Sequence, residues 1–225
     1  KENPLLDRLL LTLTQTLQFG DYLEALQNEL SALRDLSTLS VAGNKLEVVL
    51  DKGLSWAKVI VPSERRVVIL EDPSNRENLV AKAIRGEGPP AKGDIVIPKD
   101  GSLAGRVMEN GVAVAYEDLI YIPQLAPQEP YLDGPLLAIP LSANDKRIGV
   151  LVLCRPPNEP KFEPDERKRL EPVATQMALA IHSAQQYELA VERGEEMTAI
   201  VRSITDGVVV VTRHNGRVMM ANPAA

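Results

Sequence analysis

The sequence predicts an α+β domain, in which an antiparallel sheet with flanking helices lies between long helices at the two ends of the chain. Two observations support this prediction. Apolar residues recur at steps of three and four near the start and again after Pro164, whereas the middle holds short apolar segments in pairs, separated by turn residues. The first pattern is typical of amphipathic helices and the second of β-hairpins. With 225 residues, the chain can form one full domain with additional elements, or two small domains.

A stripe of leucines runs from Leu5 to Leu39, with a break at Gly20. This stripe predicts one amphipathic helix, or two helices joined near Gly20 with Asp21 as the cap of the second. After the turn signal at residues 43–44, a further helix is expected over residues 45–56.

Apolar segments in the middle of the chain predict the strands of the sheet. These segments are residues 58–61 and 65–71 around a turn at 62–64, residues 79–84, and residues 136–141 and 147–155 around a turn at 143–146. The composition of residues 79–84 also permits a short helix.

A loop-rich segment over residues 86–134 is expected to cap the domain. Its prolines and glycines are too frequent for long regular elements. Within it, residues 102–108 predict a short amphipathic helix, because Asn110 and Gly111 form a good C-terminal stop.

Pro164 and the acidic residues after it are expected to begin a long helix that reaches Ile204. Its apolar residues alternate between steps of three and four, which predicts the seam of a two-helix coiled coil and hence a homodimer. The predicted seam consists of Leu170, Val173, Met177, Ala180, Ala184, Tyr187 and Val191. Beyond it, residues 208–211 and 218–220 predict a hairpin that is too small to be stable alone, and so the start of a further domain.

Composition excludes several classes of protein. A net charge of -6 argues against binding to nucleic acid or to an anionic membrane surface, which requires clustered Lys and Arg. The single cysteine cannot form an internal disulfide, and there is no Cys/His cluster for zinc. No apolar run approaches the roughly 20 residues of a membrane span. We therefore expect a cytoplasmic piece of a longer protein, with any membrane anchor lying upstream of Lys1.

Several short motifs together resemble those of the GAF domain family. They are residues 101–107 followed by Gly111 and Asp118, residues 137–141 and 148–151, Phe162 with Asp165, and Ala174, Gln176, Ala178, Ala180 and Ile181 on the long helix. The resemblance covers about residues 21–186. It implies a sensory domain whose ligand pocket lies under the loop-rich cap.

The end of the chain is similar to the opening of a PAS domain, through residues 204–210, 215–218 and 221–225. A GAF domain, a helix and a PAS domain follow one another in bacterial sensor histidine kinases. The resemblance therefore divides the chain into an N-terminal signalling helix (1–20), a GAF-like sensory domain (21–186), a coiled-coil linker helix (187–203) and a truncated PAS-like start (204–225). The first helix is also faintly similar to a HAMP relay, although an ordinary signalling helix is favoured.

Few residues offer catalytic or cofactor chemistry. We expect His182 to be a solvated helix residue, His214 a turn residue and Cys154 a small buried hydrophobe. The Cys and His patterns of bilin-carrying and haem-binding GAF relatives are missing from the cap, so both cofactors are disfavoured. Residues 86–93 lack the residue order of a phosphate-binding loop, and the cyclic-nucleotide signature of the family is also absent. The sequence predicts no catalytic residue, metal site or cofactor.

The remaining candidate site is a small-molecule pocket under the cap. Its candidate residues are Arg106, Tyr116, Asp118, Tyr121 and Tyr131. Tyrosines combine apolar area with a hydroxyl group, which suits a small organic ligand, and Arg106 could neutralise an anionic one. Alternatively, the tyrosines pack a loop that is poor in other hydrophobes, and Arg106 faces water.

The expected function is that of a non-enzymatic, homodimeric sensory or relay module, the input region of a sensor histidine kinase. The alternative parent is a different effector, such as a cyclic-di-nucleotide enzyme. A ligand or partner at the cap would act on the sheet, and the sheet on the paired helices. Two alternatives remain open. The domain could be a ligand-free dimerisation spacer, or Asp118 and Asp133 could be hydrolytic carboxylates, although the sequence offers them no base or metal partner.

Overall fold

The computed structural model describes residues 4–41, 43–87, 95–117, 129–131, 133–207, 209–212 and 217–222. The chain divides into two compact units, residues 1–184 and residues 185–225. Four helices are described, and the fourth crosses the boundary between the units. They are α1 (Pro4–Val41), α2 (Leu46–Ile60), α3 (Leu103–Asn110) and α4 (Pro164–Ser203).

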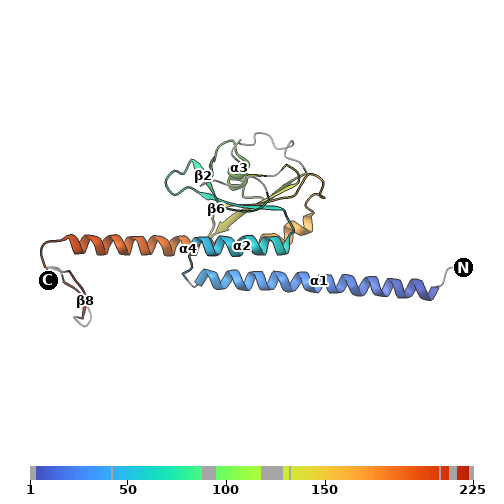
Figure 1. Ribbon diagram of the computed structural model, residues 1–225, viewed down its shortest axis with the longest axis horizontal. Helices are drawn as coiled ribbons and strands as arrows, with labels where there is room; N and C mark the ends of the chain where they lie inside the picture. Colours follow the sequence, from blue (N-terminus) through green and yellow to red (C-terminus); the bar gives the residue numbers. More distant parts are fainter. Residues whose placement is uncertain are drawn as a thin grey trace. The chain divides into compact units, whose positions relative to one another are not determined.

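Six strands of the first unit form one antiparallel sheet in the order β3-β2-β1-β6-β5-β4. The strands are β1 (Arg65–Glu71), β2 (Asn78–Gly86), β3 (Ile95–Pro98), β4 (Val114–Tyr116), β5 (Leu136–Ala143) and β6 (Lys146–Cys154). Helices α2 and α4 cover one face of this sheet and α3 covers the other (Figure 1). The prediction of an α+β fold with an antiparallel sheet and flanking helices is confirmed.

A separate hydrophobic core lies on each face of the sheet. Along β1, Val68 and Leu70 belong to the core shared with α1, α2 and α4, whereas Val67 and Ile69 belong to the core shared with α3. This division follows the alternation of side chains along a strand. Because both faces are covered, the central strands have continuous apolar runs, at residues 67–70 of β1 and 148–154 of β6.

Local sequence signals predict the β5–β6 hairpin correctly. The turn falls at Asn144 and Asp145, whose φ angles of 50° and 62° are left-handed. Asn and Asp tolerate this conformation better than most residues, and two consecutive left-handed residues match the twist of a tight hairpin. The strand prediction for residues 79–84 is also correct, since they lie within β2.

The prediction of a strand over residues 58–61 is wrong, because α2 continues to Ile60. Ala57 and Ile60 are buried on the same helical face as Val49 and Leu54, so packing favours the helix although Val59 and Ile60 are β-branched. The sheet begins only after Pro62. Two short strands, β3 and β4, lie within the segment that was expected to be a loop-rich cap.

The first helix passes through Gly20 without interruption. Of the two predicted arrangements, the single helix is therefore the one observed. In the second unit, β7 (Val209–Val211) and β8 (Val218–Ala221) form the predicted hairpin. The side-chain amide of Asn222 donates hydrogen bonds of 2.9 Å to the carbonyl groups of both Ile204 and Asp206, which ties the end of β8 to the turn after α4.

Candidate functional site

Helix α3 is capped at both ends, and at its C-terminal end by the glycine that the sequence predicts as a stop. The Ser102 hydroxyl accepts a hydrogen bond from the Gly105 N–H at 3.0 Å, and Gly111, at φ 67°, donates its N–H to the carbonyl of Val107. A Cβ atom at Gly105 would lie 1.7 Å from the carbonyl oxygen of Lys99. Glycine therefore allows the helix to begin close against the chain that leaves β3.

A buried carboxylate connects the cap to the first turn of α3. Glu129 accepts hydrogen bonds from the Ala104 N–H and from the Tyr131 hydroxyl, both at 3.3 Å. Beside it, the Arg65 Nε donates to the carbonyl of Pro130 at 2.7 Å. Burial, and then the nearby charge of Glu129, raises the pKa of Tyr131 well above its usual value. The phenol of Tyr131 therefore keeps its proton and serves Glu129 as a donor.

The predicted pocket residues do not form one pocket in the described part of the chain. Tyr116 and Tyr131 are half-buried and pack against the core on the α3 face of the sheet. Arg106 lies on α3 but lines a separate cleft. Asp118 and Tyr121 fall outside the described residues. Both described tyrosines thus contribute to packing.

The strand register places Tyr116 and the cleft at opposite ends of the sheet. Tyr116 pairs with Leu136, and Leu136 pairs with Cys154 at the end of β6. The cleft, in contrast, is lined by Glu71 at the end of β1 and by Lys146 at the start of β6. Arg106 and Tyr116 therefore do not line the same space.

We call this space the polar cleft; it has a volume of about 1010 Å³ and is lined by α3, the β1–β2 connection, the end of β3 and the β5–β6 turn. Within it, Glu71 forms ion pairs with Lys99 at 3.0 Å and Lys146 at 3.8 Å. The Nε and Nη2 atoms of Arg106 are covered and have no hydrogen-bond partner among the described residues. The polar cleft thus holds a cation that the described protein groups leave without an acceptor.

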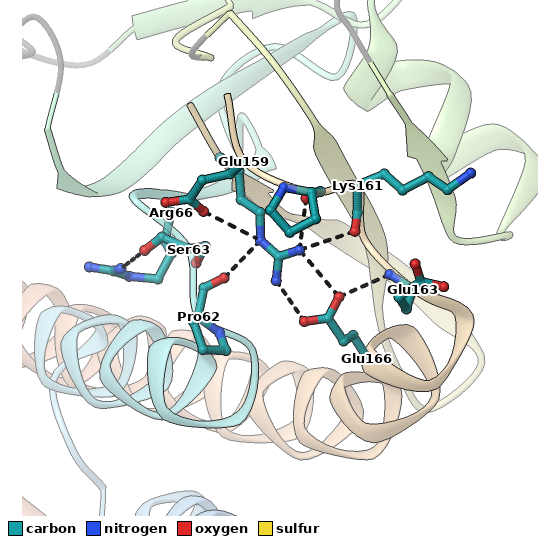
Figure 2. Close-up of polar contacts among 9 residues, drawn as sticks. Pro62, Ser63, Arg66, Glu159, Lys161, Glu163 and Glu166 are labelled. Carbon is teal, nitrogen blue, oxygen red and sulfur yellow. Dashed lines mark hydrogen bonds and ion pairs between the residues drawn. The ribbon is translucent and has the colours of Figure 1, made fainter. Parts of the chain in front are cut away.

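A second polar feature is the side chain of Arg155, which directly follows β6 and is almost fully buried. Its hydrogen-bond partners come from the turn after α2 and from the chain that leads into α4; Pro62, Lys161 and Glu166 are labelled in Figure 2. Its Nε donates to the carbonyl of Pro62 at 3.2 Å, and its Nη1 donates to the carbonyls of Pro160 and Lys161 at 3.1 and 3.2 Å. One side chain therefore binds two separate stretches of backbone, at Pro62 and at residues 160–161.

Arg155 also pairs with the first turn of α4. Its Nη2 lies 2.6 Å from the Glu166 carboxylate, which in addition accepts the N–H of Glu163 at 2.9 Å (Figure 2). The guanidinium carbon lies 4.1 Å from the centre of the Phe162 ring, in cation–π contact. We call Arg155 and Glu166 the sheet–helix ion pair. The sequence signal for this pair is an arginine that directly follows the buried strand residues 148–154, a position typical of a buried, paired charge, and the sequence-based prediction did not use it.

The predicted coiled-coil seam lies largely inside the domain. Five of its seven residues are at most 2% exposed and belong to the core between the sheet and the helices; they are Leu170, Val173, Met177, Ala180 and Ala184. The prediction that these five form a dimer seam is therefore wrong, because the sheet and the neighbouring helices already cover them. Tyr187 and Val191 are 49% and 41% exposed.

The other residues that sequence analysis singled out offer little chemistry. Cys154 is fully buried, as predicted, and His182 is half-buried rather than solvated. Asp133 is exposed, and His214 lies outside the described residues. In the described ranges, no three His, Cys, Asp or Glu side chains gather as a metal site would require. None of the helices described there combines the length and apolar character that a membrane crossing requires.

Comparison with known proteins agrees with this fold. Residues 43–182 match the family model of the GAF domain. The structure is similar to the GAF-B domain of DevS from Mycobacterium smegmatis, with 22% identity and a TM-score of 0.52 over 68% of this chain and 99% of that one. It is also similar to the GAF domain of a two-component sensor histidine kinase from Bacillus halodurans, with 20% identity and a TM-score of 0.55 over 64% and 98%. A third similar structure is the GAF domain of a phosphoenolpyruvate-protein phosphotransferase from Coxiella burnetii, with 20% identity and a TM-score of 0.58 over 72% and 98%.

Proposed function

Because this chain belongs to the GAF domain family, whose members are sensory domains of signalling proteins, we propose that it is a sensory or relay module of a bacterial signal-transduction protein. It responds to a small ligand or partner and passes the response to its long helices. The observation that carries this proposal is the sheet–helix ion pair, through which the end of a central strand contacts the first turn of α4.

The ion pair gives the proposed relay a physical route. A ligand that displaces the sheet also displaces Arg155, because this residue directly follows β6. Arg155 is bound to the Glu166 carboxylate and to the backbone carbonyls of Pro62 and Lys161. When the sheet moves, α4 must therefore move with it or these contacts must break. Either outcome changes α4, and a shift of this kind between packed elements is a known form of signal transmission.

The parent protein that we propose is a sensor histidine kinase, in which this chain is the input region. The fold similarity to a histidine-kinase GAF domain and the hairpin after α4 support this assignment. In this proposal the hairpin is the start of a PAS-like domain, the helix between is a linker, and the module itself is cytoplasmic and has no catalytic activity or cofactor. The alternative effector is another output enzyme, such as a cyclic-di-nucleotide enzyme.

The module is proposed to act as a homodimer. The proposed dimer contact lies on α1 instead of the predicted seam of α4. On α1, Phe19, Leu23, Leu26 and Leu30 follow one another at steps of four, three and four residues, and each is between 41% and 62% exposed. This spacing is that of a coiled-coil seam, which is self-complementary between two copies. The exposed stripe of α1 is therefore the proposed dimer contact in the first unit.

Two measurements on the 225-residue chain, purified without dialysis, test the proposal. They are native mass spectrometry and hydrogen exchange along α4. A sensor is expected to retain or take up a small molecule, whose removal changes the exchange of residues 164–184. A dimer that retains no molecule, and whose α4 exchange is the same for every preparation, would instead identify the ligand-free spacer. A monomer would contradict the paired helices.

A further inference from the structure

The polar cleft contains an arginine whose donors the described residues do not satisfy. Nε and Nη2 of Arg106 are covered, yet neither has an acceptor among the described residues. A covered guanidinium without an acceptor is unfavourable, because the group has lost hydrogen bonds to water and gained none in return. A rotation of the terminal torsion angles of this side chain would present its donor edge to the cleft that it lines.

The described acidic residues of the cleft do not pair with Arg106. Among the described acidic residues that line the cleft, Glu71 alone is partly buried. It is already paired with Lys99 and Lys146. The remaining acidic residues that line the cleft are exposed; they are Glu77, Asp100, Glu109 and Asp145. The half-buried guanidinium is therefore available to an acceptor that enters from solvent.

The chemistry of the lining indicates what this acceptor carries. A planar guanidinium fits a planar carboxylate through two parallel hydrogen bonds. The cleft has as many acidic as basic side chains, namely five of each, so it offers little attraction to a polyanion such as a nucleotide. Met108 and Pro98 provide apolar surface in the same cleft.

From these observations, we propose that the polar cleft binds a small carboxylate-bearing metabolite with a net charge of zero or minus one, and that Arg106 holds its carboxylate. This inference rests on the proposed sensory function and names the class of ligand and its place. The site lies at the end of the sheet that is opposite to Tyr116.

The test titrates the deuterated, ¹⁵N-labelled chain with sodium isobutyrate, L-valine and inorganic phosphate, separately and at constant ionic strength. Isobutyrate and L-valine share a branched carbon skeleton and differ in net charge, whereas phosphate is a tetrahedral anion. We expect saturable shifts in the amide signals of residues 99–108 with at least one of the two carboxylates. The Arg106→Gln variant should weaken this binding at least tenfold, and the Arg106→Lys variant should weaken it less because it keeps the charge.

The control variant is Arg34→Gln, which removes an exposed arginine of α1 and should leave the binding unchanged. Three results would overturn the inference: no saturable shift with either carboxylate, the same affinity in both Arg106 variants as in the unaltered chain, or binding of phosphate alone. If these results appear while native mass spectrometry still finds a small molecule that alters α4, the sensory function stands and only the assignment of the cleft fails.

Discussion

Replacing Arg155 with alanine should destabilise the first unit strongly. The side chain of Arg155 is 6% exposed and that of Glu166 is 16% exposed, so the pair is largely removed from water. The substitution leaves the Glu166 carboxylate without its cation and leaves the carbonyls of Pro62, Pro160 and Lys161 without their donor. Removing one partner of a buried ion pair costs about 3–5 kcal/mol. In a domain of this size that corresponds to a fall in Tm of roughly 6–20 °C.

Urea unfolding followed by the fluorescence of Trp56 measures this effect. Trp56 is the single tryptophan of the chain, and its indole N–H donates to Asp35 at 3.2 Å, so its signal reports on the packing of α1 against α2. The control is Lys168→Ala, which breaks the exposed pair with Asp165 in the same turn of α4 and should change the unfolding free energy by less than about 0.5 kcal/mol. The reasoning is refuted if Arg155→Ala lowers the unfolding free energy by less than about 1 kcal/mol, or by no more than the control does.

Three further predictions concern α3, the cap and the dimer. Gly105→Ala should lower the unfolding free energy by about 2 kcal/mol, because the added Cβ would meet the backbone at Lys99. The control is Gly20→Ala, where the added Cβ enters open space and should not destabilise the protein. Urea titration compares the two variants. The pKa of Tyr131 is raised in the folded state, so its contribution to stability is complete below about pH 10, the unfolded value, and is lost as the pH rises from there toward the folded value. Tyr131→Phe should therefore make the fall in stability above pH 10 less steep, and an unchanged slope would contradict the assignment. Leu26→Glu should weaken the dimer at least tenfold in sedimentation analysis without loss of helical circular dichroism. The control is Val112→Glu, which replaces another exposed apolar residue, located beyond the end of α3, and should leave the dimer intact.

The parts of the fold that the sequence predicts well are those decided by neighbouring residues. Ser102 and Gly111 limit α3, and Asn144 with Asp145 forms the β5–β6 turn, because each of these signals acts within a few residues. The end of α2 is different. Val59 and Ile60 favour a strand by propensity, but burial of Ala57 and Ile60 against the core keeps them helical. Strands β3 and β4, of four and three residues, depend on pairing with β2 and β5, which no local pattern reveals.

The candidate site follows the same distinction. The spacing of Leu170, Val173 and Met177 correctly indicates an apolar face of α4, but spacing does not indicate whether a sheet or a second chain covers that face. Tyr116 and Arg106 both belong to the segment around α3, yet the strand register separates them, and register is a property of the whole sheet. Arg155 is visible in the sequence as a charge at the end of an apolar strand, whereas its partner Glu166 is fixed only by the position of α4.

Burial of most of the predicted seam limits how a signal can pass along α4. One form of signal would be a change of register between two paired copies of α4. Up to Ala184, however, such a change would remove the five buried seam residues, each at most 2% exposed, from the core of the domain. A close-packed core does not allow this kind of gradual displacement. Beyond it, Gly194 has open space around its Cα, and the Thr198 hydroxyl donates to the Gly194 carbonyl within the helix at 2.8 Å. Any change of register is therefore confined to the residues after Ala184, and the part before it can respond only as one body with the sheet.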